Sequence, residues 1–122
     1  MRRLLLATIN SWNGLLAAAR SEEAFRQELW VFVIAVPLAF LIGGGLWQRV
    51  AMIGVVVLVM IVELLNTCIE KLSDHVTAHT HPAIGRIKDM GSAAVGLALL
   101  LAGLVWLVAL AERLGLFQPV ST

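Results

Sequence analysis

Four polar side chains interrupt a long apolar stretch in the middle of the chain. Glu63, Asn66, Glu70 and Asp74 follow one another at spacings of three, four and four residues. At about 100° per residue, these spacings place all four within an arc of roughly 80° on a helix. Glu63 lies about two helical turns, or roughly 10 Å, inside Glu70. The pattern predicts a polar stripe on one face of an apolar helix.

The inner end of this stripe is expensive to place in a membrane. Insertion scales assign an acidic residue at the centre of a membrane helix a cost of roughly 2.5 to 3.5 kcal/mol. Such residues normally face a bundle interior or a watery cavity, and they mark functional sites. Glu63 and Asn66 are therefore candidate catalytic residues. The alternative is that they only bond neighbouring helices and hold an oligomer together, while Glu70 and Asp74 form a solvated helix end.

More charged residues are expected at the same membrane face. Glu22, Glu23 and Glu28 precede the first apolar stretch, and Lys88 and Asp89 precede the last. Carboxylates that converge from separate segments suit Mg²⁺, which is usually bound by one or two carboxylates together with substrate phosphates. Basic side chains nearby could face phosphate oxygens. The alternative is ordinary interfacial charge.

The composition indicates a membrane protein. The chain has 122 residues, of which 60% are hydrophobic and 14% are charged, and its mean hydropathy is +0.91. A soluble domain of this length needs more polar residues to cover its surface. Apolar stretches at about 29–46, 50–69 and 93–111 are each near the roughly 20 residues that cross a hydrocarbon core. We expect an all-α membrane protein in one domain, residues 1–122, with an amphipathic surface helix at about 3–20.

The basic residues indicate how the chain is oriented. Most of them precede the first span or lie between the second and third; these are Arg2, Arg3, Arg20, Arg26, Lys71, Arg86 and Lys88. The positive-inside rule then places the N-terminus in the cytoplasm and the C-terminus outside the inner membrane. The net charge of +1 and the lack of a basic stripe argue against a nucleic-acid partner.

Three local features complete the expected architecture. The run Gly43–Gly45 is expected to end the first membrane helix and open a tight hairpin into the second. Ser21 is the expected N-cap of the first membrane helix. The single cysteine, Cys68, is expected to be a small buried apolar side chain.

The chain resembles the bacterial diacylglycerol kinase family. The resemblance is carried by Glu23–Glu28, Val59–Thr67, Ile69–Glu70 and Lys88–Val95, in matching order and spacing, and it runs from about residue 11 to residue 111. It implies a homotrimer whose subunits each have three transmembrane helices and a surface helix. It also implies active sites between subunits near the cytoplasmic face. These would transfer a phosphoryl group from ATP to diacylglycerol, giving phosphatidic acid, with Mg²⁺ as the cofactor.

The resemblance also implies roles for individual residues. Glu63 would be the general base that takes the proton from the lipid hydroxyl, Asn66 would shape the catalytic site, and Glu22 and Glu70 would hold Mg²⁺. The expected ATP contacts are Arg3, Asn10, Glu22, Glu70, His79, His81, Lys88 and Asp89. The expected lipid contacts are Arg3, Ser11, Trp12, Ala24, Gln27, Glu28, Glu63 and Ser92. The sequence departs from the family pattern at Asn10 and in an expected loop from His75 to Ile84.

Three other functions remain open from the residues. An undecaprenol kinase shares this architecture but phosphorylates a polyprenol; the run Glu23–Glu28 is closer to the diacylglycerol type. A small proton-coupled transporter would use Glu63 to exchange protons for a substrate. The pair Lys88 and Asp89 fits that class less well, because a transporter needs no phosphate-handling charges. The third alternative is a non-catalytic subunit whose polar stripe only joins helices.

Overall fold

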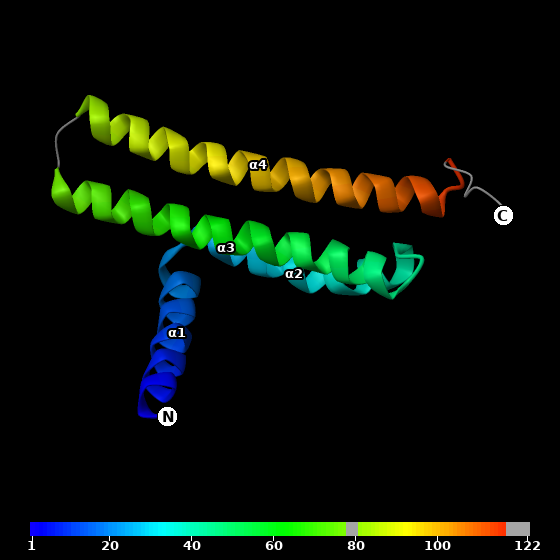
Figure 1. Cartoon of the computed structure of the whole chain (residues 1–122), viewed down its shortest axis with the longest axis horizontal. Helices are drawn as coiled ribbons and strands as arrows, with labels where there is room; N and C mark the ends of the chain where they lie inside the picture. The colour runs from blue at the N-terminus through cyan, green and yellow to red at the C-terminus, as the bar shows by residue number, and fades with distance from the viewer. Residues whose placement is uncertain (78–80, 117–122) are drawn as a thin grey trace.

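The computed structural model describes residues 1–77 and 81–116, and these residues form an all-α fold. The helices are α1 (Arg2–Ser21), α2 (Glu23–Ile42), α3 (Leu46–Val76) and α4 (Pro82–Arg113). α2, α3 and α4 run side by side, whereas α1 stands crosswise to them at the start of α2 (Figure 1). The all-α class is thereby confirmed, and α1 occupies the segment where a surface helix was expected.

Three of the helices are long and apolar enough to cross a membrane: α2, α3 and α4. α3 has 31 residues and α4 has 32, so each is close to 50 Å long at about 1.5 Å per residue. A hydrocarbon core is only about 30 Å thick. The stretches 50–69 and 93–111 therefore mark only the apolar middle of longer helices.

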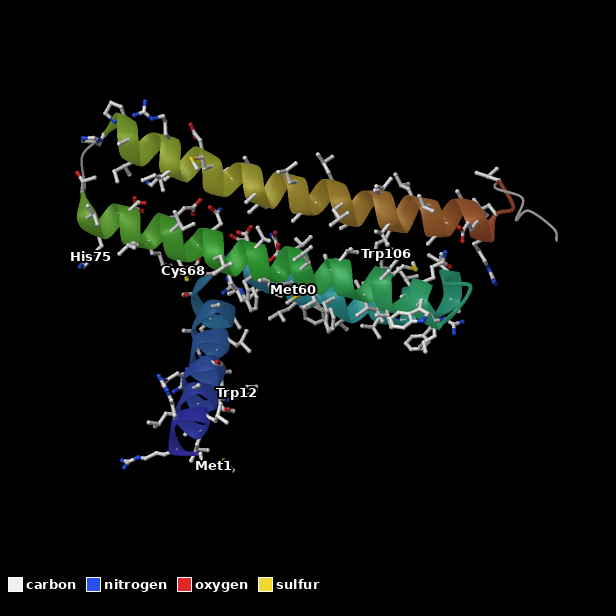
Figure 2. The ribbon with its side chains drawn as sticks, in the orientation of Figure 1. Met1, Trp12, Met60, Cys68, His75 and Trp106 are labelled. Atoms are coloured by element: carbon white, nitrogen blue, oxygen red, sulfur yellow. The ribbon has the colours of Figure 1, made fainter. Side chains whose placement is uncertain are left out.

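The expected loop from His75 to Ile84 is shorter than predicted. α3 continues to Val76, and α4 begins at Pro82. Proline suits the first turn of a helix because its missing N–H would have no intrahelical partner there. His75 and Ile84 therefore lie inside helices. We call the end of the bundle where α3 ends and α4 begins the His75 end (Figure 2).

The hairpin between α2 and α3 forms at the predicted glycines. α2 ends at Ile42 and α3 begins at Leu46, so the first membrane helix ends before the predicted residue 46 and Leu46 belongs to the second helix. A Cβ at Gly43 would lie 2.6 Å from both the carbonyl oxygen of Ala39 and Cγ of Arg49. Only glycine permits this close approach, which explains why the turn forms here.

Two local predictions were wrong. Ser21 does not cap α2: it is the last residue of α1, and its Oγ donates to the carbonyl of Ala17 at 2.7 Å. Glu22 is the residue between the helices instead, with extended backbone angles. Cys68 is exposed rather than buried, because hydropathy does not reveal which side of a helix meets its neighbours.

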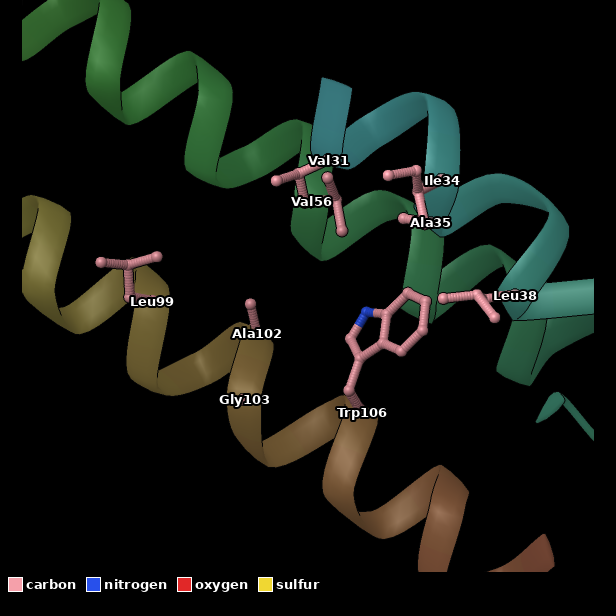
Figure 3. Close-up of a pocket in the computed structure, with 9 residues that line it drawn as sticks. All are labelled: Val31, Ile34, Ala35, Leu38, Val56, Leu99, Ala102, Gly103 and Trp106. Atoms are coloured by element: carbon pink, nitrogen blue, oxygen red, sulfur yellow. The ribbon is translucent and has the colours of Figure 1, made fainter. Parts of the chain in front are cut away.

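The buried core lies toward the opposite end from His75. Ala39, Met52 and Ala109 form it, with Trp106 packed against them. The indole Nε1 of Trp106 donates to the carbonyl oxygen of Met52 at 2.9 Å. An apolar cavity of about 400 Å³ lies beside this indole, between α2, α3 and α4 (Figure 3). Trp106 therefore joins α4 to α3 by both packing and a hydrogen bond.

Trp106→Phe is expected to lower the free energy of unfolding by about 0.5 to 1.5 kcal/mol, because it removes this hydrogen bond but keeps an aromatic ring. Thermal unfolding in detergent measures the change. Trp47→Phe is the matched control, since Trp47 is 81% exposed. Equal unfolding temperatures for the two variants would show that the bond does not stabilise the fold.

Candidate active site

Two residues of the polar stripe of α3 meet α4. Asp74 pairs with Lys88, and Asn66 is buried against Gly91. The Nδ2 atom of Asn66 donates to Oε1 of Glu70 at 3.3 Å. Its Oδ1 lies against Gly91 of α4, where an added Cβ would overlap that oxygen. The two helices therefore approach closely at Asn66 because residue 91 has no side chain.

Four carboxylates near the inner end of the stripe lie close enough for their charges to interact pairwise. Glu63 interacts with Glu70 and Glu22, and Glu28 interacts with Glu63. These residues come from α2, α3 and the link between α1 and α2. We call Glu22, Glu28, Glu63 and Glu70 the acidic cluster. The structure thus brings together acidic residues that are up to 48 positions apart in the sequence.

Two polar atoms in this region are buried without a hydrogen-bond partner among the described residues. They are Oε1 of Glu28 and Oδ1 of Asn66. A buried polar atom that lacks a partner costs free energy, and such atoms are rare in folded proteins. These atoms therefore indicate a place where a ligand or a neighbouring molecule supplies the missing contact.

Two lysines flank the acidic cluster. Nζ of Lys71 lies 2.7 Å from Oε1 of Glu22, and Nζ of Lys88 lies 2.5 Å from Oδ1 of Asp74. Both pairs lie toward the His75 end, where Figure 2 shows many side-chain oxygen and nitrogen atoms. The result is a region of mixed charge beside the carboxylates, in which cations are available to face phosphate oxygens.

The carboxylates fit Mg²⁺ that arrives with a nucleotide, rather than a metal held by protein alone. No group of three or more His, Cys, Asp or Glu side chains is arranged for a metal within residues 1–77 and 81–116. Mg²⁺ usually needs only one or two carboxylates when phosphates and water complete its coordination. Glu22 and Glu70, the residues expected to hold Mg²⁺, carry oxygen donors of that kind.

An apolar groove adjoins the acidic cluster beneath α1. We call it the α1 groove; its cavity is about 420 Å³ and its lining is almost wholly apolar. The residues that matter here are Trp12 and Leu16 of α1, Phe25 and Phe32 of α2, and Met60 and Leu64 of α3. Leu64 is the neighbour of Glu63 in the chain. The groove therefore offers space for hydrocarbon at the level of Glu63 along α3, although the Glu63 side chain does not line it.

Other predicted site residues do not converge on the cluster within one chain. The predicted site residues that are exposed and lie outside the acidic cluster are Arg3, Asn10, Ser11, Ala24, Gln27, Asp89 and Ser92. The hydroxyl of Ser11 bonds its own helix, donating to the carbonyl of Ala7 at 2.8 Å. A single chain therefore assembles the acidic part of the predicted site, with Trp12 in the adjoining groove.

Of the two histidines in the expected ATP site, only His81 lies within the described residues. His79 lies outside them. His81 is the N-cap of α4, where its Nδ1 accepts a hydrogen bond from the backbone N–H of Ala83 at 3.1 Å. In this position His81 begins the helix that carries Lys88.

Sequence reasoning assigned no role to two residues that shape this site. Gly91 stands inside a helical pattern, and a glycine there often has a packing reason, so its signal was visible. The pairing of Lys71 with Glu22 had no such signal, since the two residues are 49 positions apart and belong to different segments.

Comparison with known proteins shows the family of the chain. Residues 9–110 match the family described as prokaryotic diacylglycerol kinase. The chain is 42% identical over 113 residues to a diacylglycerol kinase of Escherichia coli, covering 93% of both chains. It is 44% identical over 106 residues to the Pseudomonas aeruginosa diacylglycerol kinase, covering 87% of this chain and 86% of the relative. The Haemophilus influenzae relative is 40% identical over 106 residues, with 87% and 90% covered. This chain therefore belongs to the prokaryotic diacylglycerol kinase family.

Proposed function

We propose that this lipid kinase transfers the γ-phosphoryl group of ATP to the hydroxyl of diacylglycerol and forms phosphatidic acid. The observation that carries the proposal is that the α1 groove, which Met60 and Leu64 line, lies at the same level of α3 as Glu63 of the acidic cluster. A phosphate-handling site needs charge, and a lipid acceptor needs an apolar surface. This chain places both at the same point along α3.

The acidic cluster suits phosphoryl transfer because this reaction asks mainly for positioning and charge neutralisation. Glu63 accepts the proton of the lipid hydroxyl as the hydroxyl oxygen attacks the γ-phosphorus and ADP leaves. A positioned base contributes about 10²- to 10⁴-fold to such a step. Asn66 holds Glu70 through its Nδ2 atom. Glu22 and Glu70 would hold Mg²⁺, which neutralises charge on the ATP phosphates when bound.

Lys88 and Lys71 are the cations that we assign to the phosphates. Each is paired with a carboxylate, Asp74 and Glu22 respectively. The Lys88–Asp74 pair is exposed on both sides, and such a pair contributes only about 0 to 1 kcal/mol, so a phosphate group can replace Asp74 at small cost. We assign Lys88 and Asp89 to the nucleotide, together with Arg3, Asn10, His79 and His81.

The α1 groove supports a lipid acceptor. In the proposed binding mode an acyl chain lies between Trp12 and Met60, and the hydroxyl reaches Glu63. Ser11, Ala24, Gln27, Glu28 and Ser92 contact the headgroup end. A polyprenol is also apolar, so undecaprenol is the alternative acceptor for the same groove.

We infer that the protein is a homotrimer of 122-residue single-domain subunits that completes its site between chains. The support is that Asp89 and Ser92 are exposed in a single chain, although family resemblance assigns both to the site. The distribution of basic residues supports an inner-membrane orientation with the N-terminus and the His75 end in the cytoplasm and the C-terminus outside.

Transfer of labelled γ-phosphate from Mg-ATP tests the proposal directly. The purified protein is assayed in mixed micelles with diacylglycerol and, in parallel, with undecaprenol. Labelled phosphatidic acid is the expected result, whereas label in undecaprenol alone would change the acceptor. No label in either lipid, from an intact oligomer, would overturn the kinase proposal. Proton-driven flux without ATP in vesicles would then indicate the transporter.

Glu70→Ala is expected to raise the Mg²⁺ concentration needed for half-maximal activity by roughly tenfold or more, because even the loss of an outer partner of a metal ligand costs 10- to 100-fold. A Mg²⁺ titration of the phosphoryl transfer rate measures the shift. Glu23→Ala is the control, since Glu23 is an exposed carboxylate at the same membrane face. An unchanged titration in Glu70→Ala would remove Glu70 from the metal site.

A further inference from the structure

The angle between α1 and α2 depends on the short junction between the two helices, which we call the elbow. Glu22 alone separates the two helices, with φ −112° and ψ 111°. α1 stands crosswise to the bundle (Figure 1) and contains no buried residue. Its apolar side borders the α1 groove rather than a closely packed helix face. Packing along α1 is therefore weak, and contacts at the elbow must hold its direction.

Arg26 makes the contact that crosses this elbow. It lies in the first turn of α2, and its Nη1 donates to the carbonyl oxygens of Ala19 at 3.2 Å and Arg20 at 2.9 Å. These carbonyls belong to the last turn of α1, where oxygens lack partners within the helix. A cation is also favoured there by the helix dipole. One side chain of α2 is thus hydrogen-bonded to the end of α1.

The neighbouring carbonyls of α1 are satisfied from within the elbow. Ala17 accepts from the hydroxyl of Ser21 at 2.7 Å, and Ala18 accepts from the backbone N–H of Glu22 at 2.8 Å. Glu22 is in turn paired with Lys71 of α3. The elbow is therefore tied to both α2 and α3, and Arg26 supplies its only described side-chain link from α2.

We propose that Arg26 is a positioning residue that holds α1 away from the bundle, keeps the α1 groove open and so controls entry of the lipid acceptor. The guanidinium is suited to this role because its Nη1 carries two N–H groups, one for each carbonyl, in a fixed planar geometry that an ammonium lacks. The inference rests on the proposed function, since it takes the α1 groove as the acceptor site. Without Arg26 the angle between α1 and α2 changes and the α1 groove loses its shape. The nucleotide region near Lys88 is unaffected.

Distances between spin labels test the elbow independently of activity. Cys68 is an exposed native cysteine on α3, and a Cβ at Gly14 of α1 would meet nothing within 4 Å. Chains labelled at Cys68 and at Gly14→Cys are diluted into unlabelled Cys68→Ser chains, so that each measured distance lies within one chain. Arg26→Gln is expected to broaden and shift the distance distribution. A distribution identical to that of the parent chain would overturn the proposal.

Kinetics test the effect on the acceptor. Arg26→Gln is expected to raise the KM for diacylglycerol by roughly three- to tenfold, the factor that corresponds to one helix-capping interaction. The KM for ATP should stay within about twofold of the parent value. Arg26→Lys keeps the charge and should fall between the two. Arg20→Gln removes a neighbouring exposed arginine of the same charge and should resemble the parent chain.

The outcomes separate this proposal from its alternatives. A parallel rise in the KM for diacylglycerol and the KM for ATP, together with loss of the oligomer, would show that Arg26 serves folding only. This result would overturn the positioning role. A changed distance distribution with an unchanged lipid KM would overturn the link between the elbow and the groove. If the parent chain phosphorylates no lipid, the proposed function fails, while the label distances still decide whether Arg26 sets the elbow.

Discussion

Glu63→Gln is expected to reduce phosphoryl transfer to the lipid by about 10²- to 10⁴-fold, the usual contribution of a positioned general base. Glutamine has nearly the same shape as glutamate but cannot take the hydroxyl proton. It also removes one negative charge from the acidic cluster, in which Glu70 and Glu22 act on Glu63. Assembly should therefore be preserved, and the loss should appear in kcat.

Two measurements separate catalysis from binding in this variant. Transfer of labelled phosphate gives the rate, and equilibrium dialysis with Mg-ATP gives nucleotide affinity, which should be close to that of the parent chain. Glu23→Gln is the matched control, because Glu23 is exposed and makes the same change of charge at the same face. Full activity of an assembled Glu63→Gln oligomer would end the general-base assignment.

Gly91→Ala is expected to lower the free energy of unfolding by about 1 to 3 kcal/mol, the usual cost of overpacking, and to remove most of the activity. The added Cβ would overlap Oδ1 of Asn66, so α4 must move away or Asn66 must turn. Turning Asn66 weakens its hydrogen bond to Glu70, and moving α4 displaces Lys88 from Asp74. Thermal unfolding in detergent and the transfer rate measure the two effects.

The sign of this effect is informative because Gly→Ala inside a helix normally stabilises it by roughly 0.5 to 1 kcal/mol. Gly85→Ala provides that comparison on α4, since a Cβ there would meet nothing within 4 Å. Adding Asn66→Ala to Gly91→Ala should restore stability but not activity, because the amide that holds Glu70 is gone. A stable, active Gly91→Ala protein would show that the close contact is not required.

The order and number of the membrane helices were predictable from the sequence. Three apolar runs of near-membrane length can only be satisfied as helices in lipid, since every backbone polar group must be bonded internally. Gly43–Gly45 marked the first hairpin because glycine permits the close approach found there. The polar stripe from Glu63 to Asp74 was also predictable, since its direction follows from the helical period alone.

The helix ends were less predictable, because hydropathy reports only the part of a helix that lies in lipid. α3 continues to Val76 and α4 begins at Pro82, in segments polar enough to be mistaken for a loop. At the elbow, Ser21 had the right side chain for an N-cap, yet it ends α1 and bonds back to Ala17. Local propensity does not distinguish these two uses of a hydroxyl.

The partners of each polar side chain were decided by the tertiary structure. Spacing within α3 gives the face on which Asn66 lies, but it does not say that Gly91 of α4 will meet that face. In the same way, Lys71 pairs with Glu22 and Lys88 pairs with Asp74 across segments that are far apart in the sequence. Helical periodicity determines the direction of a side chain relative to its own axis, whereas its contacts depend on how separate helices pack. The sequence by itself thus determined which residues are candidates for the chemistry, and only the packing of the helices decided which of them meet.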